Sequence, residues 1–287
     1  MRFINFKAGN TTRLGIKTEN GIIDVEQAAK TFALEVPTKI EDVIAAGEKG
    51  IRQLSELCER EISYLSEEEL VYAPSVTNPE KIICVGLNYV DHAKESSMDI
   101  PTSPVLFSKF NNALAAHNQT IVLPKSAEKF DYEVELVIVI GKEAANVSKD
   151  EALSYVFGYT VGNDLSARDL QFRSGQWLLG KTLDNFGPVG PYLVTADEID
   201  PNNLNIECKV NGVVKQSANT RDMIFDCATL ISYISEHMTL KPGDIIFSGT
   251  PEGVVLGYPE DQQEWLKSGD EVKVTVEQIG TLVNVLN

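Results

Sequence analysis

Cysteine, histidine and tryptophan are scarce in this sequence, and segments that mark exported or membrane proteins are missing. The 287 residues include 4 cysteines, 3 histidines and 2 tryptophans, and no two cysteines form a CxxC pair. Because segments such as KIICVGL surround cysteines with apolar residues, we expect buried free thiols, rather than disulfides or zinc ligands, at Cys58, Cys84, Cys208 and Cys227. The N-terminus MRFINFKAGN lacks the apolar core and cleavage site of a signal peptide, and no apolar run approaches the ~20 residues of a membrane span. These absences predict a soluble, cytoplasmic protein.

Positive charge is also in short supply. The chain has 25 lysines and arginines against 42 aspartates and glutamates, which gives a formal net charge of −17 and a pI near 4.6. Such a charge opposes binding to nucleic acid and to anionic lipid. A hydrophobic fraction of 43% is typical of a folded globular protein. We therefore expect no nucleic-acid or membrane partner, and the excess acids to lie on the surface, in a site, or in both.

The first part of the chain has the pattern of a small α/β unit. Two alternating runs in RLGIKTENGIIDVEQ meet at Asn20-Gly21, a dipeptide that favours the positive φ angles of a tight hairpin turn. Helical patterns follow at residues 40–46 and 50–63. The segment YAPSVTNPEK then has the Pro, Ser and Asn of a linker. The predicted N-terminal domain therefore covers residues 1–76.

Residues 77–287 are predicted to form a larger, catalytic domain. Helical patterns are few there and lie chiefly at 149–155 and 223–238. Short strand patterns follow one another in quick succession: KIICVG, PVLFSK, TIVLP, YEVELVIVIG, FGYTVGND, NIECKV with VVKQ across an Asn211-Gly212 turn, DIIFSG and EVKVTVEQIGTLVNV. Because these strands do not alternate regularly with helices, the pattern excludes a doubly wound fold and predicts a β-rich α+β fold.

Four acidic residues stand beside apolar strand patterns. In FDYEVELVIVIGK, three of them alternate with apolar residues, which places neighbours about 6.7 Å apart on one strand face: Asp131, Glu133 and Glu135. VFGYTVGND is typical of a buried strand that ends at Asp164. Converging carboxylates repel one another unless a divalent cation compensates them, and oxygen ligands select Mg²⁺ or Mn²⁺. We interpret Glu133, Glu135 and Asp164 as the ligands. Asp131, at the strand edge, is expected behind the ligands or on the surface, and a solvated strand face is the alternative interpretation.

Three further segments carry side chains suited to proton transfer or anion binding. His92 and Glu95 lie three residues apart in a short helical pattern, so Glu95 can orient His92 as a general base, although a surface His-Glu pair has the same spacing. Lys181 follows the apolar run QWLLG and either stabilises a developing enolate or extends to solvent. The strand pattern DIIFSG leads into Gly249-Thr250, where backbone N–H groups and a hydroxyl suit a substrate carboxylate.

Several segments together resemble the fumarylacetoacetate hydrolase family, in its bacterial branch of 2-oxo acid hydrolases, decarboxylases and hydratases. They occur in the family's order across residues 81–287: CVGLNYVDHAKE, FDYEVELVIVIGK, GYTVGNDLSARDLQ, QWLLGKTLDNFGPVGP and KPGDIIFSGTPEGV. The resemblance implies a β-roll catalytic domain, Mg²⁺ or Mn²⁺ dependence and a homodimer. It also associates the chain with aromatic amino acid catabolism.

Residue by residue, the resemblance implies a role for each matching position. The metal ligands it implies are Glu133, Glu135 and Asp164, and the catalytic residues are His92, Glu95 and Lys181. The residues it implies at the substrate are Arg168, Gln171, Gly249 and Thr250. Two features depart from the family pattern: Asn88 stands where the animal tyrosine-degrading enzyme has a further acid, and VVLG follows GTPEG in place of a glycine-rich continuation.

The resemblance implies a metal-dependent hydrolase that cleaves a carbon–carbon bond in fumarylacetoacetate-like or acylpyruvate 2-oxo acids. Two alternatives use the same site: decarboxylation of oxaloacetate, and hydration or isomerisation of an unsaturated 2-oxo diacid. A non-catalytic binding protein is a further hypothesis, and the intact set of acids, dyad and lysine argues against it. Because fold and metal site are shared across several reactions, the motifs do not decide the substrate.

Overall fold

The strands form three sheets across residues 1–95 and 98–287, which this computed structural model describes. The largest sheet has the order β3-β2-β1-β11-β9-β8-β14-β4-β5, with β6 paired to β11. Its strands are β1 (Arg2–Ala8), β2 (Thr11–Thr18), β3 (Gly21–Asp24), β4 (Ile82–Gly86), β5 (Val105–Lys109), β6 (Leu114–Ala115), β8 (Val134–Ile140), β9 (Val156–Asn163), β11 (Gly187–Thr195) and β14 (Ile245–Phe247). The second sheet, β13-β12-β15-β16, contains β12 (Asn205–Val210), β13 (Val213–Asn219), β15 (Glu271–Val276) and β16 (Gly280–Val285). The third pairs β7 (Phe130–Asp131) with β10 (Ser166–Ala167).

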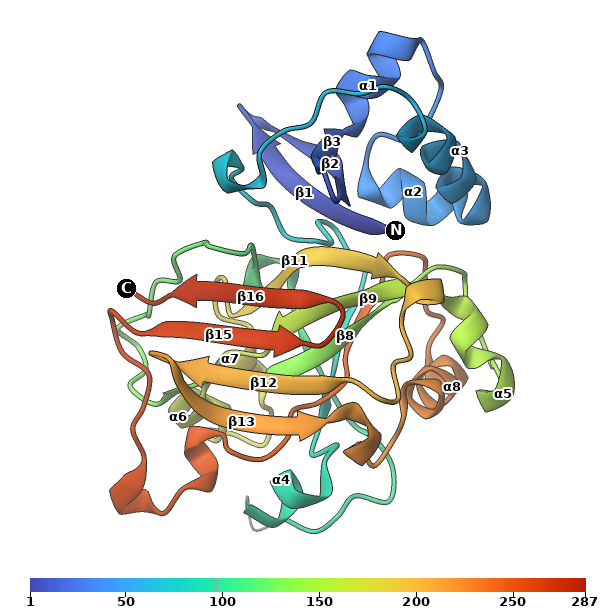
Figure 1. The fold of residues 1–287 in the computed structure, drawn as a ribbon. Coiled ribbons are helices and arrows are strands. Elements are labelled where there is room, and N and C mark those ends of the chain that lie inside the picture. Colours follow the sequence, from blue (N-terminus) through green and yellow to red (C-terminus); the bar gives the residue numbers. More distant parts are fainter. Residues whose placement is uncertain (96–97) are drawn as a thin grey trace.

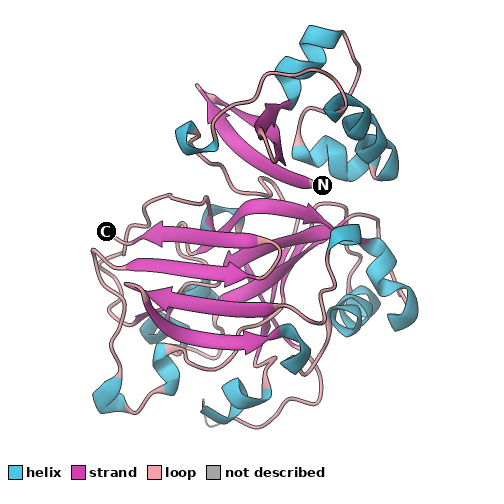
Figure 2. Ribbon diagram, in the orientation of Figure 1, coloured by secondary structure: helices cyan, strands magenta, loops and turns pink. Residues whose placement is uncertain are grey.

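The helices are short and lie around the sheets (Figure 2). They are α1 (Val25–Phe32), α2 (Ile40–Ala46), α3 (Glu48–Cys58), α4 (Val90–Glu95), α5 (Lys149–Ala152), α6 (Arg168–Gln171), α7 (Leu178–Lys181) and α8 (Cys227–His237). Single 3-10 turns lie at Glu67–Glu69, Asn111–Ala113, Leu153–Tyr155, Ala196–Glu198, Thr220–Asp222, Val255–Gly257 and Glu260–Gln262. The second predicted helix, 50–63, differs from α3, which begins two residues earlier, at Glu48, and ends at Cys58. The predicted helix 223–238 begins only at Cys227, where the Asp226 side chain accepts from Thr229 N–H.

Local turn chemistry explains the hairpins. Both predicted hairpins form, one between β2 and β3 and one between β12 and β13. Between β12 and β13, Asn211 and Gly212 have φ angles of 51° and 82°, the left-handed conformation that a two-residue hairpin turn requires. Sequence patterns missed helix α1, whose start is marked by Asp24: its carboxylate accepts a hydrogen bond from Gln27 N–H at 3.1 Å.

Strand β8 lies between two cores, and this explains why both of its faces are apolar. The second sheet covers one face of the large sheet, and Leu136 and Ile138 of β8 pack into that core (Figure 1). Val137 and Val139 point the other way, into a core shared with the N-terminal helices. Every residue from 130 to 140 is buried. The interpretation of the acidic segment as a solvated strand face is therefore wrong.

The N-terminal segment extends the large sheet. Helices α1, α2 and α3 gather beside β1, β2 and β3 at the top of Figure 1, and β1 pairs antiparallel with β11. The mixed, strand-rich architecture confirms the predicted α+β class. The four cysteines are free, as predicted, although Cys58 is only half-buried. None of the described helices has the length and apolar character to cross a bilayer.

Candidate active site

Three carboxylates meet where β8 begins and β9 ends. Glu133 directly precedes β8, Glu135 lies within it, and Asp164 directly follows β9. The antiparallel register pairs Val134 with Asn163, and Asp164 N–H donates to the Glu133 carbonyl at 3.0 Å. One oxygen from each of the three carboxylates lies within 4.8 Å of the others, and all three residues are buried. Strand register therefore brings together the three residues that the sequence singled out.

Lysine and arginine compensate part of this negative charge. Lys181, at the end of α7, places Nζ 2.8 Å from Glu133 Oε2 and 2.9 Å from Asp164 Oδ2. Arg168, at the start of α6, places a guanidinium nitrogen 2.7 Å from Glu133 Oε1. Lys181 is only 2% exposed, so the interpretation of this residue as a solvent-extended lysine is wrong.

Lys109 is a site residue that the sequence patterns missed. It ends β5, is 2% exposed, and places Nζ 2.5 Å from Asp164 Oδ1. Its ammonium also donates to the carbonyls of Leu165 at 3.1 Å, Phe186 at 2.7 Å and Lys181. Lys109 thereby connects the segment that contains Asp164 to the segment that contains Lys181. The only signal in the sequence was a lysine at the end of the apolar run PVLF.

The two glutamates of the cluster have opposite electrostatic environments. Burial alone would raise the pKa of Glu133, but the charges of Lys181 and Arg168 outweigh it and lower that pKa to about 2. Burial, with the charges of Asp164 and Glu133, raises the pKa of Glu135 well above its ordinary value. Glu135 makes no ion pair within the described parts of the chain.

The cluster fits a divalent cation. Its donors are three buried carboxylates, the hard oxygen ligands that Mg²⁺ and Mn²⁺ prefer. Asp164 Oδ1 accepts no hydrogen bond, although Lys109 lies close to it, and among the described residues no side chain pairs with Glu135. Glu133, Glu135 and Asp164 are thus the residues that would hold such an ion.

His92 and Glu95 form the pair that their spacing predicted. Both lie on α4, and His92 Nδ1 is 2.8 Å from Glu95 Oε1. The other carboxylate oxygen of Glu95 accepts the N–H of Gly253 at 2.9 Å. A carboxylate at Nδ1 favours the tautomer with the proton on Nδ1, which leaves Nε2 as the basic nitrogen. His92 is 6% exposed, so this is not a surface pair.

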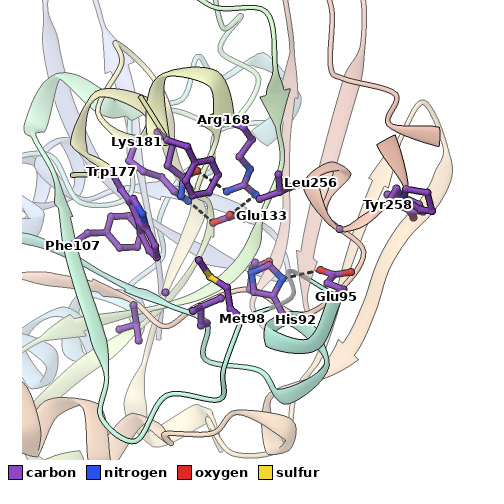
Figure 3. A pocket seen from close by; sticks show the side chains of 18 residues that line it. His92, Glu95, Met98, Phe107, Glu133, Arg168, Trp177, Lys181, Leu256 and Tyr258 are labelled. Carbon is purple, nitrogen blue, oxygen red and sulfur yellow. Dashed lines mark hydrogen bonds and ion pairs between the residues drawn. The ribbon is translucent and has the colours of Figure 1, made fainter. Parts of the chain in front are cut away.

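These groups open onto one pocket of about 600 Å³ (Figure 3). Polar side chains line part of it: His92, Glu95, Glu133, Arg168, Gln171, Lys181 and Thr250. Apolar and aromatic residues with glycines line the rest: Val85, Gly86, Leu87, Met98, Phe107, Phe172, Trp177, Leu256, Gly257, Tyr258 and Pro259. Glu133 reaches the pocket surface, whereas Glu135 and Asp164 lie behind it.

The four predicted substrate residues occupy different positions. Arg168, Gln171 and Thr250 line the pocket, and Arg168 donates to Gln171 Oε1 at 2.9 Å. Gly249 lies outside the lining, and its N–H donates to Glu135 Oε2 at 2.6 Å. This N–H therefore holds Glu135 in place rather than facing the pocket. With φ at +101°, the position favours glycine.

Asn88 and Gly249 fit together closely. A Cβ added at Gly249 would lie 2.7 Å from the Cβ of Asn88. The Asn88 amide donates to the carbonyls of Ser248 at 2.7 Å and Phe225 at 3.0 Å, and its oxygen accepts from Phe225 N–H at 2.8 Å. Asn88 is fully buried and does not line the pocket. In this chain it joins three backbone segments.

Asp131 is a buried support of the site. Its carboxylate accepts from Arg168 Nε at 2.9 Å, from Val255 N–H at 2.8 Å and from Leu256 N–H at 3.1 Å. The expectation of a surface position is wrong, because Asp131 is buried and lies behind Glu133, to which Arg168 connects it. The VVLG segment, which departs from the family pattern, is thus bound through its backbone, and Leu256 can line the pocket.

Asp131→Asn should destabilise the protein by about 1–3 kcal/mol, because one amide oxygen cannot accept all these hydrogen bonds and Arg168 loses a buried counter-charge. Urea unfolding measures the change. Asp91→Asn is the matched control, since the Asp91 side chain is 67% exposed and its ion pair with Lys94 lies at the surface. Equal stabilities of the two variants would contradict the supporting role.

Known proteins resemble the whole chain. The family model "Fumarylacetoacetate (FAA) hydrolase C-terminal" matches residues 81–287. A fumarylacetoacetate hydrolase domain-containing protein 2 homolog from Dictyostelium discoideum is 46% identical over 95% of this chain and 92% of its own. Human mitochondrial oxaloacetate tautomerase FAHD2A is 40% identical over 99% of this chain and 91% of its own.

Solved structures share the fold. Fumarylacetoacetate hydrolase from Exiguobacterium antarcticum has a TM-score of 0.84 and 32% identity, and covers 100% of this chain and 99% of its own. Fumarylpyruvate hydrolase from Pseudomonas aeruginosa, in complex with Mn²⁺ and pyruvate, has a TM-score of 0.67 and 31% identity, and covers 73% of this chain and 90% of its own. With the acidic cluster, the dyad and the buried lysine in one pocket, this protein is a member of the fumarylacetoacetate hydrolase family.

Proposed function

We propose that this protein is a metal-dependent enzyme that interconverts the keto and enol forms of a 2-oxo acid, with oxaloacetate as the first substrate to test. The observation that carries the proposal is the oriented His92–Glu95 pair in the same pocket as Glu133 and Lys181. Tautomerisation needs a base for the C3 proton and positive charge at the developing enolate oxygen. The full-length similarity to oxaloacetate tautomerases supports this reaction.

Each site residue has a separate role in this reaction. A bound Mg²⁺ or Mn²⁺ would polarise the 2-oxo group and orient the substrate carboxylate. His92 Nε2 removes a proton from C3, and Glu95 stabilises the imidazolium that forms. Lys181 uses two N–H groups on Glu133 and Asp164 and keeps a third for the enolate oxygen. Return of the proton to that oxygen completes an isomerisation, with no other reactant consumed.

Hydrolysis of an acylpyruvate is the second candidate. The similarity to a fumarylpyruvate hydrolase favours it, and the same dyad would activate a water molecule that attacks the distal carbonyl. When the carbon–carbon bond breaks, the 2-oxo acid fragment would leave as an enolate whose oxygen faces Lys181. Decarboxylation of oxaloacetate would need the enolate stabilisation but no base, so its rate should depend little on His92.

His92→Ala should lower the tautomerisation rate by about 10²–10⁴-fold, because the general base is lost. The assay follows the enol absorbance of oxaloacetate, pyruvate release and acylpyruvate cleavage, with Mg²⁺ or Mn²⁺ and again with a chelator. His237→Ala is the control, since His237 is exposed and lies outside the pocket. Full tautomerase activity in His92→Ala would refute the assigned base, and unchanged rates with chelator would refute the metal dependence.

The oligomeric state and the cellular location stay predictions. The homodimer expectation rests on the family resemblance, and light scattering coupled to size-exclusion chromatography tests it. We expect a cytoplasmic protein from the sequence, whereas related oxaloacetate tautomerases are named mitochondrial. Cell fractionation with an antibody to this protein decides between the two. The boundary between 1–76 and 77–287 also stays a proposal, and limited proteolysis can test it.

A further inference from the structure

We infer that the pocket selects 2-oxo acids whose C3 substituent is aromatic, in preference to small aliphatic 2-oxo acids. This inference deepens the proposed function and rests on it for the reaction. It is carried by the size of the pocket and by an aromatic wall beside Lys181.

The pocket is larger than a four-carbon acid requires. Its volume of about 600 Å³ lies within the range of roughly 300–1,000 Å³ that is typical of sites for drug-sized ligands. A small 2-oxo acid held at Glu133 and Lys181 would fill only part of this volume. The remainder would hold water against apolar walls, and displacing weakly held water with an apolar group favours binding.

An aromatic wall stands beside the reacting centre. Lys181 Nζ lies 5.0 Å from the centroid of the Phe107 ring, and Trp177 packs edge-on against Phe107 with centroids 5.4 Å apart. In Figure 3 these two rings lie on one side of Glu133, and His92 lies on the other. Because the wall flanks Lys181, an aryl group on a 2-oxo acid held at Lys181 can reach it across the pocket. Ring pairs of this kind favour edge-to-face or offset packing.

Gly86 holds the wall in position. A Cβ at Gly86 would lie 2.6 Å from a ring carbon of Trp177, so the indole rests against bare backbone. Gly86 is the last residue of β4, and Phe107 lies opposite Cys84 in the neighbouring strand β5. The wall is thus built on paired strands, with Trp177 seated across them. An alanine at residue 86 should displace the indole while leaving its chemistry unchanged.

The test compares one reaction on three substrates. NMR monitors deuterium exchange at C3 in a buffer that contains Mg²⁺ and no Mn²⁺. The exchange rates give kcat/KM for phenylpyruvate, 2-oxobutanoate and oxaloacetate. We expect phenylpyruvate to exceed 2-oxobutanoate by at least about tenfold, the discrimination that an apolar pocket provides. Trp177→Ala and Gly86→Ala should each reduce this ratio by about tenfold, and Trp177→Phe should retain most of it. Phe110→Ala is the control, since Phe110 is 56% exposed and outside this pocket.

Direct binding separates this inference from the proposed reaction. Trp265→Phe leaves Trp177 as the single tryptophan, and N-phenyloxamate, an unreactive aryl 2-oxo acid analogue, should quench its fluorescence more strongly and at lower concentration than oxamate. Binding of N-phenyloxamate without turnover of any 2-oxo acid would refute the proposed reaction and support the aromatic subsite. Turnover of oxaloacetate with equal rates for phenylpyruvate and 2-oxobutanoate would overturn the subsite and leave the reaction standing.

Discussion

Glu135→Gln should stabilise the cation-free protein by about 1–3 kcal/mol at pH 8, and should abolish the stabilisation that Mg²⁺ or Mn²⁺ gives the wild type. Glu135 is 1% exposed and shares the cluster with Glu133 and Asp164, without an ion-pair partner among the described residues. Glutamine removes the like-charge repulsion and keeps an oxygen for Gly249 N–H. The same change removes a ligand that a divalent cation needs.

The effect has a defined pH dependence. Burial and the neighbouring carboxylates raise the pKa of Glu135 in the native, cation-free state. Above about pH 4.3, the ordinary pKa of glutamate, the unfolded chain is ionised more readily than the native protein, so Glu135 lowers native stability. Below that pH both states are protonated, and the difference between wild type and Glu135→Gln should vanish.

Urea unfolding from pH 8 to pH 4 measures this difference, with a chelator and again with Mn²⁺. Glu236→Gln is the control, because Glu236 is exposed on α8 and far from the cluster in sequence. A loss of stability in cation-free Glu135→Gln at pH 8 would contradict the electrostatic account. A wild-type response to Mn²⁺ in this variant would contradict the assignment of Glu135 as a ligand.

Lys181→Met should destabilise the cation-free protein by about 3–5 kcal/mol, because it leaves buried carboxylates without their shared counter-charge. Lys181 Nζ contacts both Glu133 and Asp164. Burial alone would lower the pKa of Lys181, but Asp164 and Glu133 outweigh it and raise that pKa. A raised lysine pKa means that the stabilisation is fully present below about pH 10.4 and is lost as the pH rises through the native pKa.

A double-mutant cycle assigns this loss to the ion pair. Adding Glu133→Gln to Lys181→Met should restore part of the lost stability, because one of the uncompensated charges disappears. Lys273→Met is the matched control: Lys273 pairs with Glu271 on the surface, where the side chains are 41% and 39% exposed, so its loss should cost about 0–1 kcal/mol. A loss in Lys181→Met no larger than that control would refute the buried network.

Some site features could be predicted because neighbouring residues encode them. Spacing alone brought His92 and Glu95 onto one helix, and the Asn211-Gly212 turn followed from backbone preferences. Strand burial was harder to predict. Alternation on a strand implies one solvated face, but β8 lies between two cores, and Asp131 on the neighbouring β7 is buried against Arg168.

Local sequence patterns identify the kinds of chemistry available: the acids at β8 and β9, the His-x-x-Glu pair, a lysine after an apolar run, and a charge that opposes nucleic acid. Which of these groups meet depends on the fold. The β8–β9 register places Asp164 next to Glu133, the end of β5 brings Lys109 to Asp164, and Trp177, just before α7, packs against Phe107 of β5. These contacts join residues that are distant along the chain, so their geometry depends on strand pairing and core packing rather than on local periodicity.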